Sequence, residues 1–172
     1  MGELIDDLLA LSRTARAPLK RTDVELGALV ASVVQELQPD CAGRRIEWRI
    51  GPLPTVSGDR GLLRVLLQNL LSNSAKYTRS RELAVIEVGA ERLENDESAV
   101  FVRDNGVGFE MQYQDKLFGV FQRLHSDKEF DGTGIGLATA RRIVVRHGGR
   151  IWGEGQPGHG ATFYFTLEGI EE

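Results

Sequence analysis

The chain has 172 residues, of which 41% are hydrophobic and 27% charged, and its formal net charge is −4. This length fits one domain with its own core, and the composition is that of an ordinary globular protein. The acidic balance excludes a basic footprint for nucleic acid, and no apolar run is long enough to cross a bilayer. Cys41 is the only cysteine, which excludes a disulfide framework and a cysteine metal cluster. We expect a reducing, cytoplasmic setting.

Residues 2–17 carry apolar side chains at roughly helical spacing, and Pro18 ends the helix that this pattern predicts. A stripe this narrow on a short helix needs a partner helix. We therefore expect residues 1–19 to be the tail of a longer helical hairpin, and residues 20–172 to form the domain that follows it.

Helices are predicted at residues 26–37, at 59–77 with Asp59 as N-cap, and at 134–147, where Gly148 and Gly149 end the helix. Strands are predicted at 46–50, 83–92, 98–104, 150–155 and 161–167, and irregular backbone at 105–133. Because strands come in adjacent pairs with helices gathered between them, we expect an α/β fold. It would be a two-layer sandwich of one mixed or largely antiparallel sheet with helices on one face.

A polar row runs along the predicted helix at 59–77. Asn69, Asn73 and Lys76 fall at positions i, i+4 and i+7 and so share one face, away from the leucines that point to the core. Hard cations accept an asparagine oxygen as ligand, a lysine neutralises phosphate, and the ring of Tyr77 is available to a base. The row fits a polyphosphate and metal site, or an ordinary solvated helix face.

Two glycine-rich segments follow. Asp104-Asn105-Gly106-Val107-Gly108 ends the strand at 98–104, where a carboxylate can accept a hydrogen bond from an exocyclic amine and glycines let the backbone pass close to a base. A plain Asp-Asn-Gly turn has the same residues. Gly132 to Leu137 opens the helix at 134–147, and glycine-flanked amides at a helix N-terminus bind anions. This segment fits neither the dinucleotide motif nor a P-loop.

In this order, the segments resemble the ATPase superfamily of histidine kinases, DNA gyrase and heat-shock chaperones. The matching segments are Asn69–Thr78 (N box), Asp104–Phe109 (first glycine box), Phe118–Arg123 (F box), Gly132–Leu137 (second glycine box) and Gly160–Phe163 (terminal strand). The F box is typical of the histidine kinases, and residues 118–124 with 129–152 are similar to the kinase modules of bacterial phytochromes and related PAS or GAF sensor kinases. The resemblance implies a Bergerat-type ATP-binding fold. It also implies that the protein is a kinase, and so a transferase, that acts in two-component phosphorelay signalling.

At the phosphate end of the nucleotide, the resemblance implies that Asn73 coordinates the Mg²⁺ of ATP, with support from Asn69, and that Lys76 contacts phosphate. Residues 109–131 would form a lid over the nucleotide. The lid and the second glycine box would supply the remaining contacts: Phe118 and Phe121 as hydrophobic anchors, Arg123 on the γ-phosphate, and Gly132, Thr133, Gly134, Ile135, Gly136 and Leu137 at the start of the helix.

At the base end, the resemblance implies that Tyr77 lies along the adenine and that Asp104 accepts its amine, helped by a bound water and the hydroxyl of Thr162. Gly106 and Gly108 would give the nucleotide room. Two smaller departures from the family pattern are Ser74, where alanine is usual, and Glu110, where aspartate is common.

The chain contains His125, His147 and His159, none of which lies in the acceptor motif of these kinases, and we interpret all three as structural. The resemblance therefore implies Mg-ATP binding and transfer of the γ-phosphate to a histidine on a hairpin outside this chain, for relay to the receiver domain of a response regulator. The parent protein would be a homodimer and this fragment a monomer, without contacts to nucleic acid or membrane.

Two alternatives remain open at this stage. One is a stand-alone nucleotide-binding regulatory module or a serine kinase of the same superfamily, as in anti-sigma factors. The other is a degenerate fold that binds no nucleotide, against which the intact boxes argue.

Overall fold

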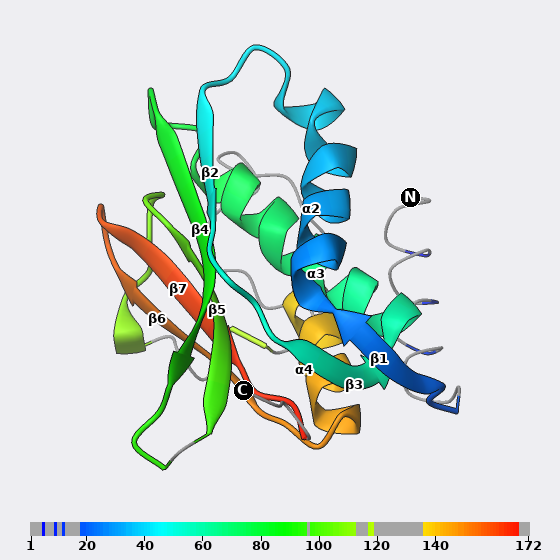
Figure 1. Ribbon diagram of the computed structural model, residues 1–172. Helices are drawn as coiled ribbons and strands as arrows, with labels where there is room; N and C mark the ends of the chain where they lie inside the picture. The colour runs from blue at the N-terminus through cyan, green and yellow to red at the C-terminus, as the bar shows by residue number, and fades with distance from the viewer. Residues whose placement is uncertain are drawn as a thin grey trace.

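The computed structural model describes residues 18–95, 97–112, 117–118 and 136–168, together with the single residues 5, 9 and 12. The elements in chain order are β1 (Arg21–Glu25), α2 (Leu26–Leu37), the 3₁₀ turn η1 (Pro39–Cys41), β2 (Ile46–Ile50), β3 (Thr55–Asp59), α3 (Arg60–Tyr77), β4 (Ala84–Arg92), β5 (Ser98–Asp104), α4 (Gly136–Arg146), β6 (Ile151–Gln156) and β7 (Gly160–Phe165). Figure 1 shows two layers, with helices α2, α3 and α4 packed against one face of the larger sheet.

The larger sheet has the strand order β2-β4-β5-β7-β6. Strands β2 and β4 are parallel, whereas the pairs β4–β5, β5–β7 and β6–β7 are antiparallel. The prediction of a mixed sheet with helices on one face is therefore confirmed. A second sheet of two antiparallel strands, β1 and β3, was not predicted.

The core lies between the large sheet and the helices, and α3 contributes most to it. Leu63, Leu66, Leu67, Leu70 and Leu71 of α3 are each at most 1% exposed and pack with buried residues of α2, β4 and β5. The helix begins where predicted, because the Asp59 carboxylate accepts a hydrogen bond from the backbone N–H of Leu62 at 3.1 Å.

Helix α4 ends at Arg146, one residue before the predicted end, and the predicted glycines close it: Gly148 has a φ of +76°, which suits glycine, and the N–H of Gly149 donates to the carbonyl of Val144. Just before these glycines, His147 is fully buried. Its Nε2 accepts the backbone N–H of Asp59 at 3.0 Å, so its Nδ1 carries the proton and donates to the carbonyl of Ile143 at 2.7 Å. The structural role predicted for His147 is confirmed, and the imidazole ties the end of α4 to the start of α3.

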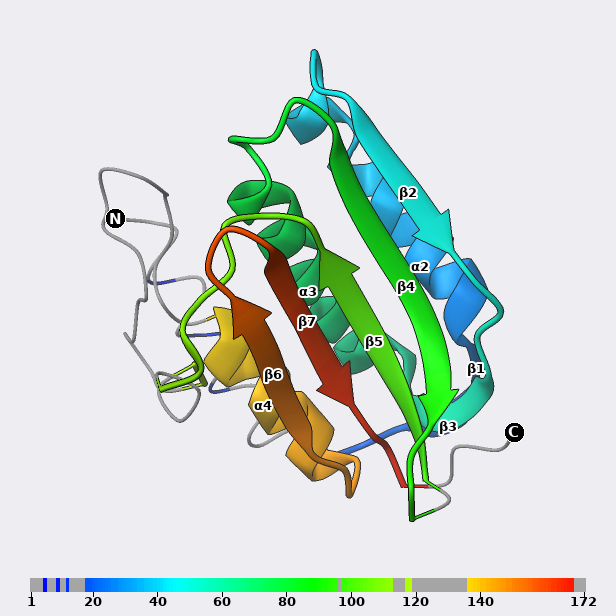
Figure 2. The same ribbon diagram turned by 90° about the vertical axis from the view of Figure 1, so that its left-hand side faces the viewer.

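Figure 2 views the sheet from the face that the helices leave uncovered. On that face Trp152 and Tyr164 stack at 5.2 Å between ring centroids, and Phe101 lies beside Tyr164. The guanidinium groups of Arg103 and Arg150 lie 4.7 Å and 4.5 Å from the ring centroids of Phe101 and Trp152. The cations thus cover aromatic surface that would otherwise face water.

Of the helix predicted at residues 2–17, the structure describes Ile5, Leu9 and Ser12, all three helical and exposed; the rest of that segment lies outside the described residues. The boundary at residue 19 stays a prediction. Within the described part of the chain, no helix is both long and apolar enough for a bilayer crossing.

Candidate functional site

The polar row of α3 lies on a side of the helix that carries none of the buried leucines. Asn69, Asn73 and Lys76 are all half-buried. Asn69 lies against the first residue of α4, because a Cβ added to Gly136 would stand 3.4 Å from the Asn69 Oδ1. The structure therefore brings the row of α3 and the beginning of α4 together, although 67 residues separate them in sequence.

Asp104 ends β5 and is only 6% exposed. Its Oδ1 accepts hydrogen bonds from the N–H groups of Gly106 at 2.9 Å and Ala161 at 3.3 Å. Burial raises the pKa of the carboxyl, an effect that the Gly106 N–H, the Ser74 hydroxyl and the Ala161 N–H oppose but do not cancel. Among the described residues both backbone donors reach Oδ1, so Oδ2 of this buried carboxylate can accept a hydrogen bond from a ligand.

The glycines after Asp104 allow a close approach of backbone segments. A Cβ on Gly106 would lie 2.3 Å from the carbonyl oxygen of Tyr77, and Gly108, with φ +69°, would place one 2.1 Å from the carbonyl oxygen of Gln156. The N–H of Val107 also donates to the Tyr77 carbonyl at 3.1 Å. The turn after β5 is thus fixed to the end of α3, where the Lys76 ammonium lies 4.9 Å from the ring centroid of Tyr77.

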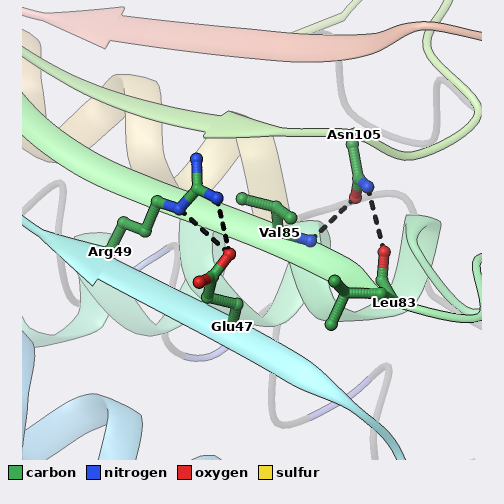
Figure 3. A network of polar contacts seen from close by, with 5 residues as sticks. All are labelled: Glu47, Arg49, Leu83, Val85 and Asn105. Atoms are coloured by element: carbon green, nitrogen blue, oxygen red, sulfur yellow. Dashed lines mark hydrogen bonds and ion pairs between the residues drawn. The ribbon is translucent and has the colours of Figure 1, made fainter.

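Two residues support this turn in ways that the sequence did not predict. The guanidinium of Arg81 donates to the carbonyls of Asn105 at 2.7 Å, Gly106 at 3.2 Å and Gly158. The Asn105 side chain accepts from the N–H of Val85 at 2.9 Å and donates to the carbonyl of Leu83 at 3.0 Å (Figure 3). These contacts span about 20 to 77 residues, and no local pattern in the sequence signals them.

Thr162 lies on the other face of the sheet from Asp104. It is in register with Arg103, whose Nε donates to its hydroxyl at 3.3 Å, whereas the residue in register with Asp104 is Ala161. Since side chains alternate between the two faces of a strand, the hydroxyl of Thr162 cannot face the Asp104 carboxylate. This corrects the prediction that it assists Asp104.

Phe118 contacts Phe163 of β7 edge to face, with 6.3 Å between ring centroids, and so lies on the side of the sheet that carries Asp104. Gly136 and Leu137 begin the described part of α4. Several predicted residues lie outside the described residues, and their roles stay predictions: Phe121, Arg123, Gly132, Thr133, Gly134 and Ile135. The same holds for His125, while His159 is exposed between β6 and β7.

The described residues contain no group of three or more His, Cys, Asp or Glu side chains that could hold a metal ion. A divalent ion at the polar row would therefore find the amide oxygens of Asn69 and Asn73 and would need its other ligands from water or a bound phosphate. Mg²⁺ commonly binds in this way, with few protein ligands, so the residues present fit it.

Residues 58–169 match the family described as "Histidine kinase-, DNA gyrase B-, and HSP90-like ATPase". The chain is 43% identical over 167 residues to cyanobacterial phytochrome A of Nostoc sp. (strain PCC 7120), covering 97% of this chain and 22% of the relative. It is 36% identical over 172 residues to the adaptive-response sensory kinase SasA of Thermosynechococcus vestitus, covering 97% of this chain and 45% of that kinase.

Among solved structures, the fold matches the crystal structure of full-length ShkA in complex with AMPPNP, with a TM-score of 0.79 and 28% sequence identity. That match covers 98% of this chain and 36% of the other. The chain spans between about a fifth and just under half of the length of these three proteins.

Proposed function

Because the chain belongs to the histidine kinase-, DNA gyrase B- and HSP90-like ATPase family, we propose that it is the catalytic module of a sensor histidine kinase. It binds Mg-ATP and transfers the γ-phosphate to a histidine on a helical hairpin, for relay to the receiver domain of a response regulator. The observation that carries the proposal is the Asp104 carboxylate, which is 6% exposed, lies beside a glycine backbone, and receives its backbone N–H donors on one oxygen only. The similarity to ShkA, solved with an analogue of ATP, supports it.

At the base end, Oδ2 of Asp104 accepts a hydrogen bond from the exocyclic amine of adenine, while Oδ1 stays bonded to Gly106 and Ala161. The ring of Tyr77 lies along the base, and the absence of side chains at Gly106 and Gly108 leaves space for it. A guanine at this position would turn a carbonyl oxygen toward the carboxylate, and the repulsion would exclude it.

At the phosphate end, Lys76 neutralises phosphate charge, and Asn73, supported by Asn69, holds Mg²⁺. The ion supplies charge neutralisation as the phosphoryl group moves, which is the main requirement of this reaction. The amides from Gly132 to Leu137 receive phosphate oxygens at the start of α4. Phe118 anchors the lid on β7, and Phe121 and Arg123 complete it, with Arg123 on the γ-phosphate.

The phosphate acceptor is a histidine outside this chain. Both ring nitrogens of His147 are occupied by backbone groups in the core, so this imidazole cannot reach ATP. Residues 1–19 are the end of the hairpin that carries the acceptor in the parent protein, a homodimer in the cytoplasm.

The test is a calorimetric titration of the 172-residue chain with AMPPNP, with and without Mg²⁺. We expect saturable binding that Mg²⁺ strengthens, and binding of the matching guanine analogue at least about tenfold weaker, since one lost hydrogen bond to a charged group is worth about 1.4 kcal/mol or more. No binding at millimolar nucleotide would overturn the proposal. With γ-labelled ATP, label should appear on the parent's hairpin when it is added and not stably on the isolated chain.

A further inference from the structure

Ser74 occupies a core position of α3 and carries a polar group there. It follows Leu70 and Leu71 by one helical turn and is only 1% exposed. Among the described residues its Oγ has no hydrogen-bond partner, and it is the one buried side-chain oxygen or nitrogen in that state. Leaving a buried hydroxyl unpaired costs about 1–3 kcal/mol, so such an atom in a folded protein needs an explanation.

The Ser74 hydroxyl does not form the hydrogen bond that such hydroxyls usually form within a helix. A serine or threonine in a helix commonly donates to a carbonyl one turn back. Ser72 does so to Asn69 at 3.3 Å, and Thr78 does so to the carbonyl of Ser74 at 2.8 Å. The Ser74 hydroxyl instead lies near the Asp104 carboxylate and lowers its pKa, without forming a hydrogen bond of regular geometry to it.

The strand on the other side of Asp104 supplies no side-chain donor. The residue in register with Asp104 on β7 is Ala161, and the hydroxyl of Thr162 is on the opposite face of the sheet with Arg103. Of the described side chains, Ser74 is therefore the one whose hydroxyl acts on the Asp104 carboxylate. A buried hydroxyl without a hydrogen-bond partner thus lies near a carboxylate whose two backbone donors both reach the same oxygen.

Adenine has the complementary pair of groups. On one edge its exocyclic amine, a donor, is adjacent to a ring nitrogen that accepts. Guanine has the reverse order on that edge, a carbonyl oxygen beside a ring N–H.

We propose that Ser74 is a specificity residue of the base site. Its hydroxyl donates, directly or through one water, to the acceptor ring nitrogen of adenine, while Asp104 accepts from the adjacent amine. This inference rests on the proposed function and deepens it: Ser74 supplies from α3 the hydroxyl that β7 does not supply from Ala161.

The test compares Ser74→Ala with Ser72→Ala, a neighbouring exposed serine of the same helix, by calorimetry with AMPPNP and by thermal unfolding without nucleotide. Ser74→Ala should weaken binding about 3- to 10-fold, the effect of one neutral hydrogen bond, and Ser72→Ala should not change it. Without nucleotide, Ser74→Ala should melt at the same or a higher temperature, since an unpaired buried hydroxyl is removed. A purely structural serine would give a lower melting temperature.

Two further measurements assign the contact. ATP whose adenine carries carbon in place of the acceptor nitrogen should bind the wild-type chain about 3- to 10-fold more weakly than ATP, but should bind Ser74→Ala as well as ATP does. Adding Ala161→Ser to Ser74→Ala should restore part of the affinity, because it places a hydroxyl on the same face as Asp104.

Equal AMPPNP affinity of Ser74→Ala and the wild-type chain would overturn the role of Ser74 and leave the proposed function intact. The same conclusion would follow if the carbon-substituted nucleotide were weakened equally in both proteins. Failure of the wild-type chain to bind AMPPNP would instead overturn the proposed function and this inference with it.

Discussion

Asp104→Asn exchanges one carboxylate oxygen for an amide nitrogen and keeps the shape of the side chain. In the free protein the remaining oxygen still accepts from Gly106 and Ala161, at 2.9 Å and 3.3 Å in the wild-type chain. Burial raises the pKa of Asp104, which means that the folded protein disfavours its charge. We therefore expect the nucleotide-free variant to have an unfolding free energy equal to or greater than that of the wild type.

Nucleotide binding by the same variant should be severely weakened. The new amide nitrogen would face the amine of adenine, donor against donor, where the carboxylate made a charge-assisted hydrogen bond. A bond of that kind contributes about 1.5–3 kcal/mol, so the Kd for AMPPNP with Mg²⁺ should rise by about 10- to 150-fold. Calorimetry measures this change, and Asp23→Asn, at an exposed position of β1, should leave the Kd unchanged.

The pH dependence gives a second readout. The pKa of Asp104 is raised above 3.8, so the free carboxyl takes up a proton at a higher pH than an exposed aspartate does. Because Oδ1 accepts from two N–H groups, the proton would be on Oδ2, where it places a donor opposite the amine of adenine and removes the charge. Wild-type affinity should therefore decrease as the pH falls toward that raised pKa, with no such decrease from this group in Asp104→Asn. Undiminished binding by Asp104→Asn would refute the assignment, and a large drop in its melting temperature without nucleotide would refute the account of the buried charge.

Three other predictions concern the scaffold of the site. Gly106→Ala should lower both the melting temperature and AMPPNP affinity, because its Cβ would lie 2.3 Å from the carbonyl oxygen of Tyr77. As a control, Gly27→Ala, in an open position of α2, should stabilise the chain by up to about 1 kcal/mol. Arg81→Ala should cost about 1–3 kcal/mol in urea unfolding, since three carbonyls lose a charged donor, and Arg81→Lys should recover only part of this because an ammonium lacks the planar fork. Burial lowers the pKa of His147, so the unfolded chain binds a proton that the folded chain does not; the unfolding free energy should fall as the pH is lowered below about 6.5, and His147→Gln should flatten that slope.

The elements that the sequence predicts correctly have a strong local signal. The helix α3 has a continuous apolar stripe and a capping aspartate, and both of its ends lie within one residue of the prediction. The strands β1 and β3 have no such signal. Each buries a single aliphatic residue, Val24 or Val56, and they form a sheet only by pairing with each other across 30 to 38 residues. Sequence periodicity cannot detect a strand of that kind.

The same distinction applies to the site. Asn69, Asn73 and Lys76 share a face by helix geometry alone, and Asp104 stands at the end of a readable strand, so these positions could be predicted. The face of the sheet on which Thr162 lies could not be predicted, because a shift of one residue in register moves a side chain to the opposite face. Arg81 was missed because a guanidinium can bond carbonyls from many segments and no spacing rule identifies them.

The distribution of hydrogen bonds around Asp104 separates the framework of the site from the atoms left for a ligand. Arg81 and Asn105 bond the backbone of the turn on both sides, so the turn is held without nucleotide. Within the described part of the chain, Oγ of Ser74 is buried without a hydrogen-bond partner, and both backbone donors to the buried Asp104 carboxylate reach Oδ1. A ligand that pairs with the Ser74 hydroxyl and donates to Oδ2 of Asp104 removes the cost of the unpaired hydroxyl and finds the turn already in place. Nucleotide should therefore raise the melting temperature as mass action requires, by the equivalent of about 2.7 kcal/mol at a hundredfold excess over Kd, without a change in the circular dichroism of the sheet and helices.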